Sequence, residues 1–112
     1  MKKIYFHIYK GRPLDPEDNR TSADELHIHV QFSVPEMHTT LMDWLDNSPN
    51  LLGCVQMYIR DEHTGLGILD IAIPKGAEPN SALRMVKASV ELFCTRYDYD
   101  SQIFMTEPPC LS

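Results

Sequence analysis

The sequence predicts an α+β domain in which one mostly antiparallel β-sheet carries two helices on one of its faces, in the chain order ββαββαβ. Three observations lead to this class. Several segments alternate apolar and polar residues with a period of two, which is typical of strands. Two other segments place apolar residues at helical spacing. Glycine, proline and asparagine, which favour turns, separate these segments along the chain.

Residues 3–9 and 25–33 are the first two predicted strands. In each strand the apolar side chains point to one face of the sheet, and the other side chains point to the opposite face. Residues 10–23 connect the strands and are rich in proline and charged groups, so they predict a long loop. The side chains expected on the opposite face are Tyr5, His7, Tyr9, His27, His29, Gln31 and Ser33.

The hydrophobic period changes after the second strand, which predicts the first helix. Ser33 and Glu36 have the spacing of a capping box, in which two side chains bond backbone N–H groups at the start of a helix. Pro35 between them is tolerated in a first helical turn. The helix is expected to stop near Asp46, where the sequence DNSPN begins. Its apolar stripe consists of Met37, Leu41, Trp44 and Leu45.

The rest of the chain predicts three strands, one helix and a tail. The fourth strand is the most apolar of the five, so we expect it to be central in the sheet. The second helix carries an apolar stripe of its own, which includes Val86, Val90 and Phe93. The predicted strands are residues 52–60, 66–74 and 102–106, the helix is 81–97, and 107–112 is a tail expected to fray.

The order of elements from the second strand onward is βαββαβ, which is the ferredoxin-like order. The first strand would then be an extra strand at an edge of the sheet. Other strand orders are compatible with the same pattern, because alternation assigns side chains to faces and does not assign neighbours to strands.

The length of 112 residues predicts a single domain, residues 1–112, with one hydrophobic core. The formal net charge of −6 disfavours direct binding to nucleic acid, because phosphate groups are repelled. An acidic surface is compatible with a basic protein partner, or with a partner that itself binds nucleic acid. The longest apolar run is too short to cross a membrane, and no leader sequence is recognisable at the N-terminus. We therefore expect a cytoplasmic protein that does not bind membranes.

The three cysteines, Cys54, Cys94 and Cys110, are widely spaced and form no C-x-x-C pair. Reduced thiols are the expected state, and each cysteine is interpreted as a small apolar side chain instead of a nucleophile. No catalytic motif is recognisable elsewhere in the chain. The sequence thus favours a protein without catalytic residues and without a cofactor.

The histidines His27 and His29 are the one pattern that resembles a metal site. Residues two apart in a strand share a face and lie about 6.5–7 Å apart, so two imidazoles could converge on one metal ion. A third ligand would be needed, and His7 and Asp70 are the candidates. The alternative is that both histidines belong to the solvated face of the sheet, so no metal ligand is assigned.

The same face gathers residue types that are common in protein interfaces. Tyrosine and arginine are enriched where proteins bind each other, whereas acidic residues and lysine are depleted there. If the third strand follows the same alternation, Gln56 joins this face as well. The predicted partner-binding patch consists of Tyr5, His7, Tyr9, His27, His29, Gln31, Tyr58 and Arg60.

Three functional hypotheses follow from the sequence. The leading hypothesis is a protein-binding module without catalysis, acting as an inhibitor of the phage counter-defence or toxin-immunity type. The first alternative is a small metal-dependent enzyme or module that uses His27 and His29. The second alternative is a regulatory or ligand-binding domain that self-associates as a homodimer through the open sheet face.

Overall fold

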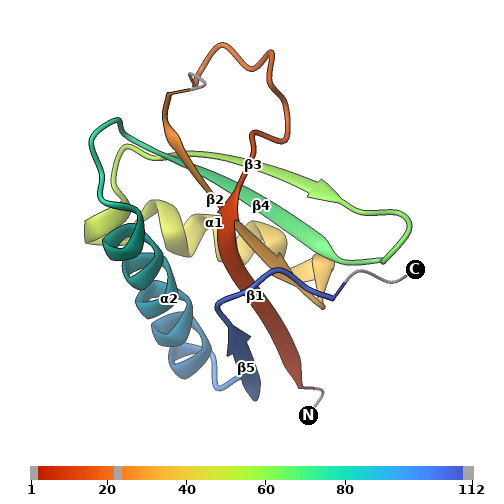
Figure 1. The fold of residues 1–112 in the computed structure, drawn as a ribbon. Helices are drawn as coiled ribbons and strands as arrows, with labels where there is room; N and C mark the ends of the chain where they lie inside the picture. The colour runs from red at the N-terminus through yellow and green to blue at the C-terminus, as the bar shows by residue number, and fades with distance from the viewer. Residues whose placement is uncertain (1–2, 22–23, 110–112) are drawn as a thin grey trace.

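The computed structural model describes residues 3–21 and 24–109, which form one mixed five-stranded sheet with two α-helices on one face (Figure 1). The α+β class and the chain order ββαββαβ are confirmed. Short 3₁₀ turns at Pro35–Met37 and Pro49–Leu51 flank the first α-helix. The elements are β1 (Ile4–Gly11), β2 (Leu26–Phe32), α1 (His38–Asp46), β3 (Val55–Arg60), β4 (Gly67–Ile73), α2 (Pro79–Arg96) and β5 (Ser101–Phe104).

The strand order is β3-β4-β2-β1-β5. All neighbouring strands are antiparallel except β1 and β5, which are parallel. The prediction that the first strand lies at an edge is wrong, because β1 lies between β2 and β5. In a ferredoxin-like sheet β5 would pair with β2. Here β1 occupies that position through six paired residues with β2, and β5 is displaced to the edge.

The hydrophobic core lies between the sheet and the two helices. Every residue of β4 is buried, and β4 is an interior strand, although β2 holds the middle position. The predicted helical stripes are confirmed on this face, where Leu41 and Leu45 of α1 meet Val86, Val90 and Phe93 of α2. The strands contribute Phe6, Ile8, Ile28, Val30, Phe32, Leu69 and Ile71 to the same core.

The predicted capping box of the first helix is not formed. The hydroxyl oxygen of Ser33 accepts the backbone N–H of Tyr5 at 2.9 Å, and the N–H of Ser33 donates to the carbonyl of Tyr5 at 3.1 Å. Ser33 therefore extends the pairing between β1 and β2 and is not available as a cap. The chain enters α1 through the 3₁₀ turn that begins at Pro35, and no side chain caps either helix start there.

The second helix has a side-chain cap that the sequence pattern did not reveal. The carboxylate of Glu78 accepts the backbone N–H groups of Asn80 and Ser81 at 3.0 and 2.8 Å. These hydrogen bonds lower the pKa of Glu78. Pro79 occupies the first turn, so α2 begins two residues before the predicted start at Ser81.

Contacts between the two helices centre on Trp44. Its indole N–H donates to the backbone carbonyl of Ser89 at 2.9 Å, and its ring lies 6.1 Å from that of Phe93. The hydrogen bond satisfies the polar atom of a side chain that is otherwise packed against the core. Among the described residues, no helix has both the length and the apolar content that a membrane crossing requires.

The adjacent residues Leu92 and Phe93 of α2 test this core. Phe93 is fully buried, whereas Leu92 is 62% exposed. Phe93→Ala should lower the free energy of unfolding by about 3–5 kcal/mol, because it removes a buried ring and leaves a cavity. Leu92→Ala should change it by no more than about 0.5 kcal/mol. Urea denaturation followed by circular dichroism measures both, and equal losses would contradict the assigned helix face.

Candidate functional site

The sheet face opposite α1 and α2 is called the second face below. Pairing across the strands places Tyr9 beside His29, His29 beside Asp70 and Asp70 beside Met57. These side chains form one row across four strands, because directly paired residues share a face of the sheet. The second face therefore carries histidine, tyrosine and a carboxylate side by side.

Six of the eight residues predicted for the partner-binding patch lie on the second face, and two do not. Tyr58 pairs with Leu69, whose side chain is in the core, so Tyr58 faces the helices. Its ring stacks on His38 at 4.0 Å. Arg60, two residues further along, is on the helix side as well. The six on the second face are Tyr5, His7, Tyr9, His27, His29 and Gln31.

The predicted orientation of strand β3 is wrong, although apolar and polar residues alternate regularly along it. In VQMYIR the structure turns the apolar set away from the helices, and the loop after β1 lies against part of that set. Gln56 is also on the helix side, where its amide donates to the carbonyl of Met42 and to the carboxylate of Asp46. The residues that β3 contributes to the second face are Val55, Met57 and Ile59.

The histidines of β2 are not solvated, because the chain itself covers them. His27 is 4% exposed and His29 is 8% exposed. The loop that follows β1, whose described residues are 12–21 and 24–25, lies beside this end of the sheet (Figure 1). His29 Nε2 donates to the carbonyl of Arg12 at 2.6 Å, and the N–H of Leu14 donates to Asp70 Oδ2 at 3.0 Å. Two hydrogen bonds between sheet side chains and the loop backbone thus fix the start of the loop.

The carboxylate of Asp70 is the centre of a buried polar cluster. His27 Nδ1 lies 2.9 and 3.1 Å from the two carboxylate oxygens, and His29 Nε2 lies 4.0 Å from the nearer one. A carboxylate at Nδ1 favours the tautomer with a proton on that nitrogen, which leaves His27 Nε2 as an acceptor. His27 Nε2 is buried and has no hydrogen-bond partner among the described residues.

Gly11 is required where β1 passes the cluster. A Cβ atom at this position would lie 2.6 Å from three atoms of the His29 ring. Any other residue would force the imidazole away from the Arg12 carbonyl. The glycine at the end of β1 therefore allows the histidine and the loop to meet.

A small hollow lies between the loop and His27. Its volume is about 10 Å³, which is enough for one water-sized group. Asp18, which lines it, is held by a bidentate pair with Arg20 that lowers the pKa of Asp18 to about 2. The other lining residues are Asp15, Thr21, His27, Val55, Met57, Asp70 and Ala72.

The structure does not bring the ring nitrogens of His27 and His29 to a common metal position. The nitrogen of His29 nearest to the cluster is used by the Arg12 carbonyl, and His27 Nδ1 is used by Asp70. His7, the other candidate ligand, instead hydrogen-bonds through Nδ1 to the carbonyl of Thr106. Among the described residues, no three His, Cys, Asp or Glu side chains are placed to share a metal ion.

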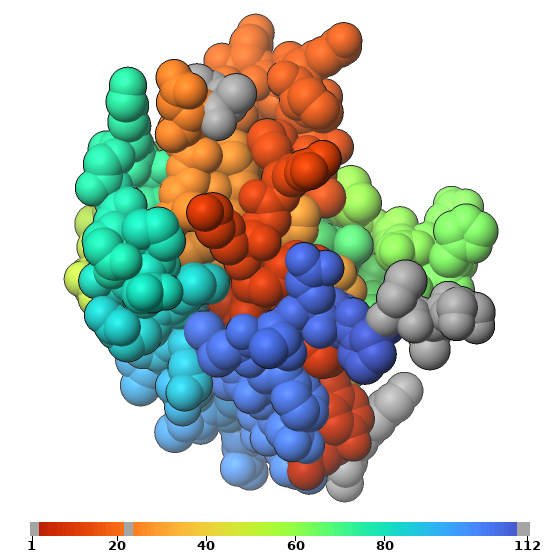
Figure 2. Space-filling model, viewed as in Figure 1, coloured from red at the N-terminus to blue at the C-terminus, as the bar shows by residue number. Residues whose placement is uncertain are grey.

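The segment after β5 crosses the second face in front of β1 (Figure 1). Its start is fixed by the hydrogen bond from His7 to Thr106, 3.1 Å long, and by stacking of the Phe104 ring on the His7 ring at 4.8 Å. The space-filling view shows atoms of this segment directly against those of β1 (Figure 2). Part of the predicted frayed tail, 107–109, is thus described, and residues 110–112 lie outside the described residues.

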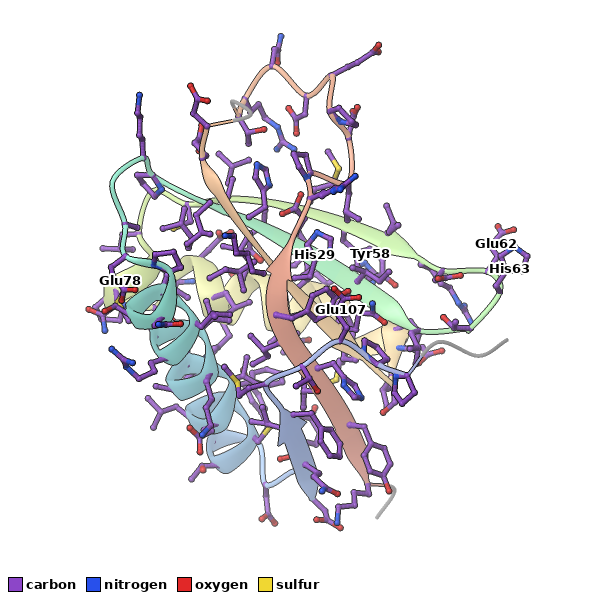
Figure 3. The ribbon with its side chains drawn as sticks, viewed as in Figure 1. His29, Tyr58, Glu62, His63, Glu78 and Glu107 are labelled. Atoms are coloured by element: carbon purple, nitrogen blue, oxygen red, sulfur yellow. The ribbon has the colours of Figure 1, made fainter. Side chains whose placement is uncertain are left out.

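A larger hollow remains between the loop and this segment. Its volume is about 480 Å³, and we call it the Tyr9 hollow. His29 and Glu107 lie close together in this region, whereas Glu62 and His63 project from the distant β3–β4 turn (Figure 3). The lining residues are Tyr9, Lys10, Gly11, Arg12, His29 and Glu107.

Tyr9 is held in the hollow by two contacts. Its hydroxyl accepts a hydrogen bond from the amide of Gln31, and its ring meets the edge of His29 at 5.4 Å. Burial raises the pKa of Tyr9, and the charge of Glu107 acts in the same direction, while the bond from Gln31 opposes them. Tyr9 is therefore a neutral hydrogen-bonding group at ordinary pH.

The described cysteines lack the environment of nucleophiles. Cys54 is half-buried and Cys94 is buried, and both thiols are free. Burial is the main cause that raises the pKa of each, and nearby acidic groups act in the same direction. Their thiolate forms are thus disfavoured at neutral pH. Cys110 lies outside the described residues.

Comparison with known proteins gives no family assignment. No family model and no curated protein matches the chain. Two solved structures align over 92% of this chain and 99% of their own, each with a TM-score of 0.43. One is a hypothetical protein from Staphylococcus aureus with 9% identity, and the other is the ribosomal processing protease Prp from S. aureus with 10% identity. At these scores neither likeness bears on the function of this chain.

Replacing Asp70 by asparagine tests the buried cluster. Both His27 Nδ1–H and the N–H of Leu14 donate to the carboxylate. The NH₂ of an asparagine would face one of these donors and could not accept its hydrogen bond. Asp70→Asn should therefore lower the free energy of unfolding by about 1–3 kcal/mol. Amide hydrogen exchange at Leu14 should accelerate selectively. Asp43→Asn, on the exposed side of α1, is the matched control. Unchanged protection of Leu14 would contradict the assigned tether.

Proposed function

We propose that this chain is a protein-binding module without catalysis and that its partner contacts the Tyr9 hollow. The observation that carries the proposal is that Tyr9 and Arg12 meet in a concave surface on the second face. Tyrosine and arginine are the residue types that most often dominate binding energy, and they do so best in pockets that exclude water.

The walls of the hollow are fixed before any partner arrives. Tyr9 is held by Gln31, and His29 is held by the Arg12 carbonyl next to Gly11. A surface whose side chains are already ordered loses less conformational entropy on binding. The backbone of Arg12 is tethered while its side chain is exposed, so the guanidinium is presented on a rigid base.

The charge of the chain supports a basic partner. The net charge is −6, and the loop beside the hollow carries Asp15, Glu17 and Asp18, while the hollow itself is lined by Lys10, Arg12 and Glu107. Acidic groups around a binding surface accelerate encounters with basic proteins. We propose a partner that is basic or that binds nucleic acid, and an inhibitor that covers its surface in the cytoplasm, as phage counter-defence and toxin-immunity proteins do.

Arg12→Ala is the sharpest test, because the hydrogen bond that Arg12 makes to the described part of the chain uses its backbone carbonyl, which the substitution keeps. A partner would be isolated by affinity capture from the cells that encode the chain, and its affinity measured by calorimetry. Arg12→Ala and Tyr9→Ala should each cost about 2 kcal/mol or more of binding free energy. Each variant must keep the wild-type circular dichroism spectrum.

Arg84→Ala on α2 is the matched control for Arg12→Ala, because it removes the same exposed charge from the other side of the molecule. Its effect on binding should be within about 0.5 kcal/mol. If the Arg12 and Arg84 variants bind equally well, the captured protein does not use the Tyr9 hollow and the proposal fails.

A second candidate, a metal-dependent module, is favoured by one observation. The Asp70 carboxylate lies at Nδ1 of His27. Among the described residues, the buried Nε2 of His27 has no hydrogen-bond partner, and His27 lines a hollow together with Asp15 and Asp18. Histidines that bind metals usually have such a carboxylate at the other nitrogen. This candidate uses His27 together with oxygen atoms of the loop, and it does not use His29.

Titration with Zn²⁺ or Mn²⁺ separates the two candidates. The leading proposal expects no stoichiometric binding by calorimetry and no change in melting temperature. One bound equivalent in the wild type that disappears in His27→Gln, but persists in His63→Gln, would favour the metal-dependent module. His63 is exposed in the turn between β3 and β4, so its loss controls for weak surface binding.

A further inference from the structure

Strand β3 is an edge strand that lacks the usual protection against pairing. Its only strand neighbour among the described residues is β4, and the register runs without a bulge from Val55 to Arg60. Natural edges are commonly blocked by proline, charged side chains, bulges or a covering segment. The sequence VQMYIR contains no proline, and its one charged residue, Arg60, is the last of the strand. Its outward N–H and C=O groups are therefore available to another strand.

From this edge we infer that two copies of the chain pair through β3 in antiparallel orientation, with Met57 opposite Met57 of the second copy. Paired residues of the two copies must lie on the same face of the continuous sheet. Since side chains on one face are two residues apart, an odd-numbered residue must pair with an odd-numbered one, and an even-numbered residue with an even-numbered one. The register about Met57 pairs all positions from Val55 to Ile59. The result is one continuous sheet that spans both copies.

The register about Met57 brings apolar side chains together on the second face. Val55 of one copy pairs with Ile59 of the other on each side of the central methionines. Ile59 is 41% exposed in the single chain, and Val55 and Met57 are only partly buried. Pairing therefore removes exposed apolar surface from water, which supports a second copy of this chain as the occupant of the edge.

The helix side of the same edge is complementary in charge. Arg60 would lie opposite Cys54 of the second copy. The carboxylate of Asp46 lies beside this position, because it accepts the amide of Gln56 and acts on the Cys54 thiol. The two-fold axis repeats the pair, so an Arg60–Asp46 ion pair flanks the apolar strip at each end. The Tyr9 hollow, on β1 and β2, stays accessible in such a dimer.

Cysteine cross-linking tests the register directly. In the proposed dimer, Met57→Cys places two thiols across the two-fold axis, with Cα atoms about 4.5–5.5 Å apart, which suits a disulfide. Met57→Cys should therefore form a covalent dimer on mild oxidation. Ile59→Cys should not form a covalent dimer. Residue 59 pairs with residue 55 of the second copy, so the two introduced cysteines would be about 13 Å apart along the strands. The wild-type chain controls for its native cysteines.

Charge reversal tests the ion pair in solution by sedimentation equilibrium. Arg60→Glu and Asp46→Arg should each weaken self-association by at least about tenfold, and the double variant should restore it. Arg84→Glu on α2 is the matched control and should leave self-association unchanged. Circular dichroism establishes that each variant is folded.

A wild-type chain that stays monomeric at every concentration would overturn the inference. So would a double variant that associates no better than Arg60→Glu alone. Cross-linking of Tyr58→Cys in preference to Met57→Cys would refute the register. None of these outcomes depends on a partner at the Tyr9 hollow, so this inference and the proposed function fail or succeed separately.

Discussion

The buried carboxylate of Asp70 is the constraint on which the second face depends. An ionised carboxylate in the middle of a sheet is costly unless hydrogen-bond donors surround it. The chain supplies these donors from two directions: His27 from the neighbouring strand and the N–H of Leu14 from the loop. The hydrogen bonds that Asp70 requires therefore also determine where the loop lies. The loop in turn positions the Arg12 carbonyl that accepts the hydrogen bond from His29.

The parts of the fold that follow from local pattern could be predicted. Alternation in β1 and β2 assigned their side chains to the correct faces, and helical spacing identified the core stripes. The position of β1 could not be predicted, because no local signal states which strands become neighbours. The face of β3 could not be predicted for a different reason: the loop after β1 lies against Val55 and Met57, so apolar side chains of this strand are partly covered on the second face as well.

The sequence could predict which side chains share the second face, but it could not predict which of them are exposed there. The spacing of His27 and His29 correctly placed them together, but their burial depends on a polar loop whose path no local pattern of alternation predicts. One signal could have revealed it. Asp70 is the sole charge in the otherwise apolar strand GILDIAI, and an isolated carboxylate in a buried strand requires nearby donors.

The parallel pairing of β1 with β5 joins segments that are far apart in sequence, since Ile4 lies opposite Ser101. Contacts between residues so far apart in sequence form late and slow the folding of small domains. During synthesis, one side of β1 stays without its strand neighbour until residues 101–104 emerge. A nascent chain therefore exposes an extended edge containing Phe6 and Ile8, and in that interval it is vulnerable to pairing with other unfinished chains.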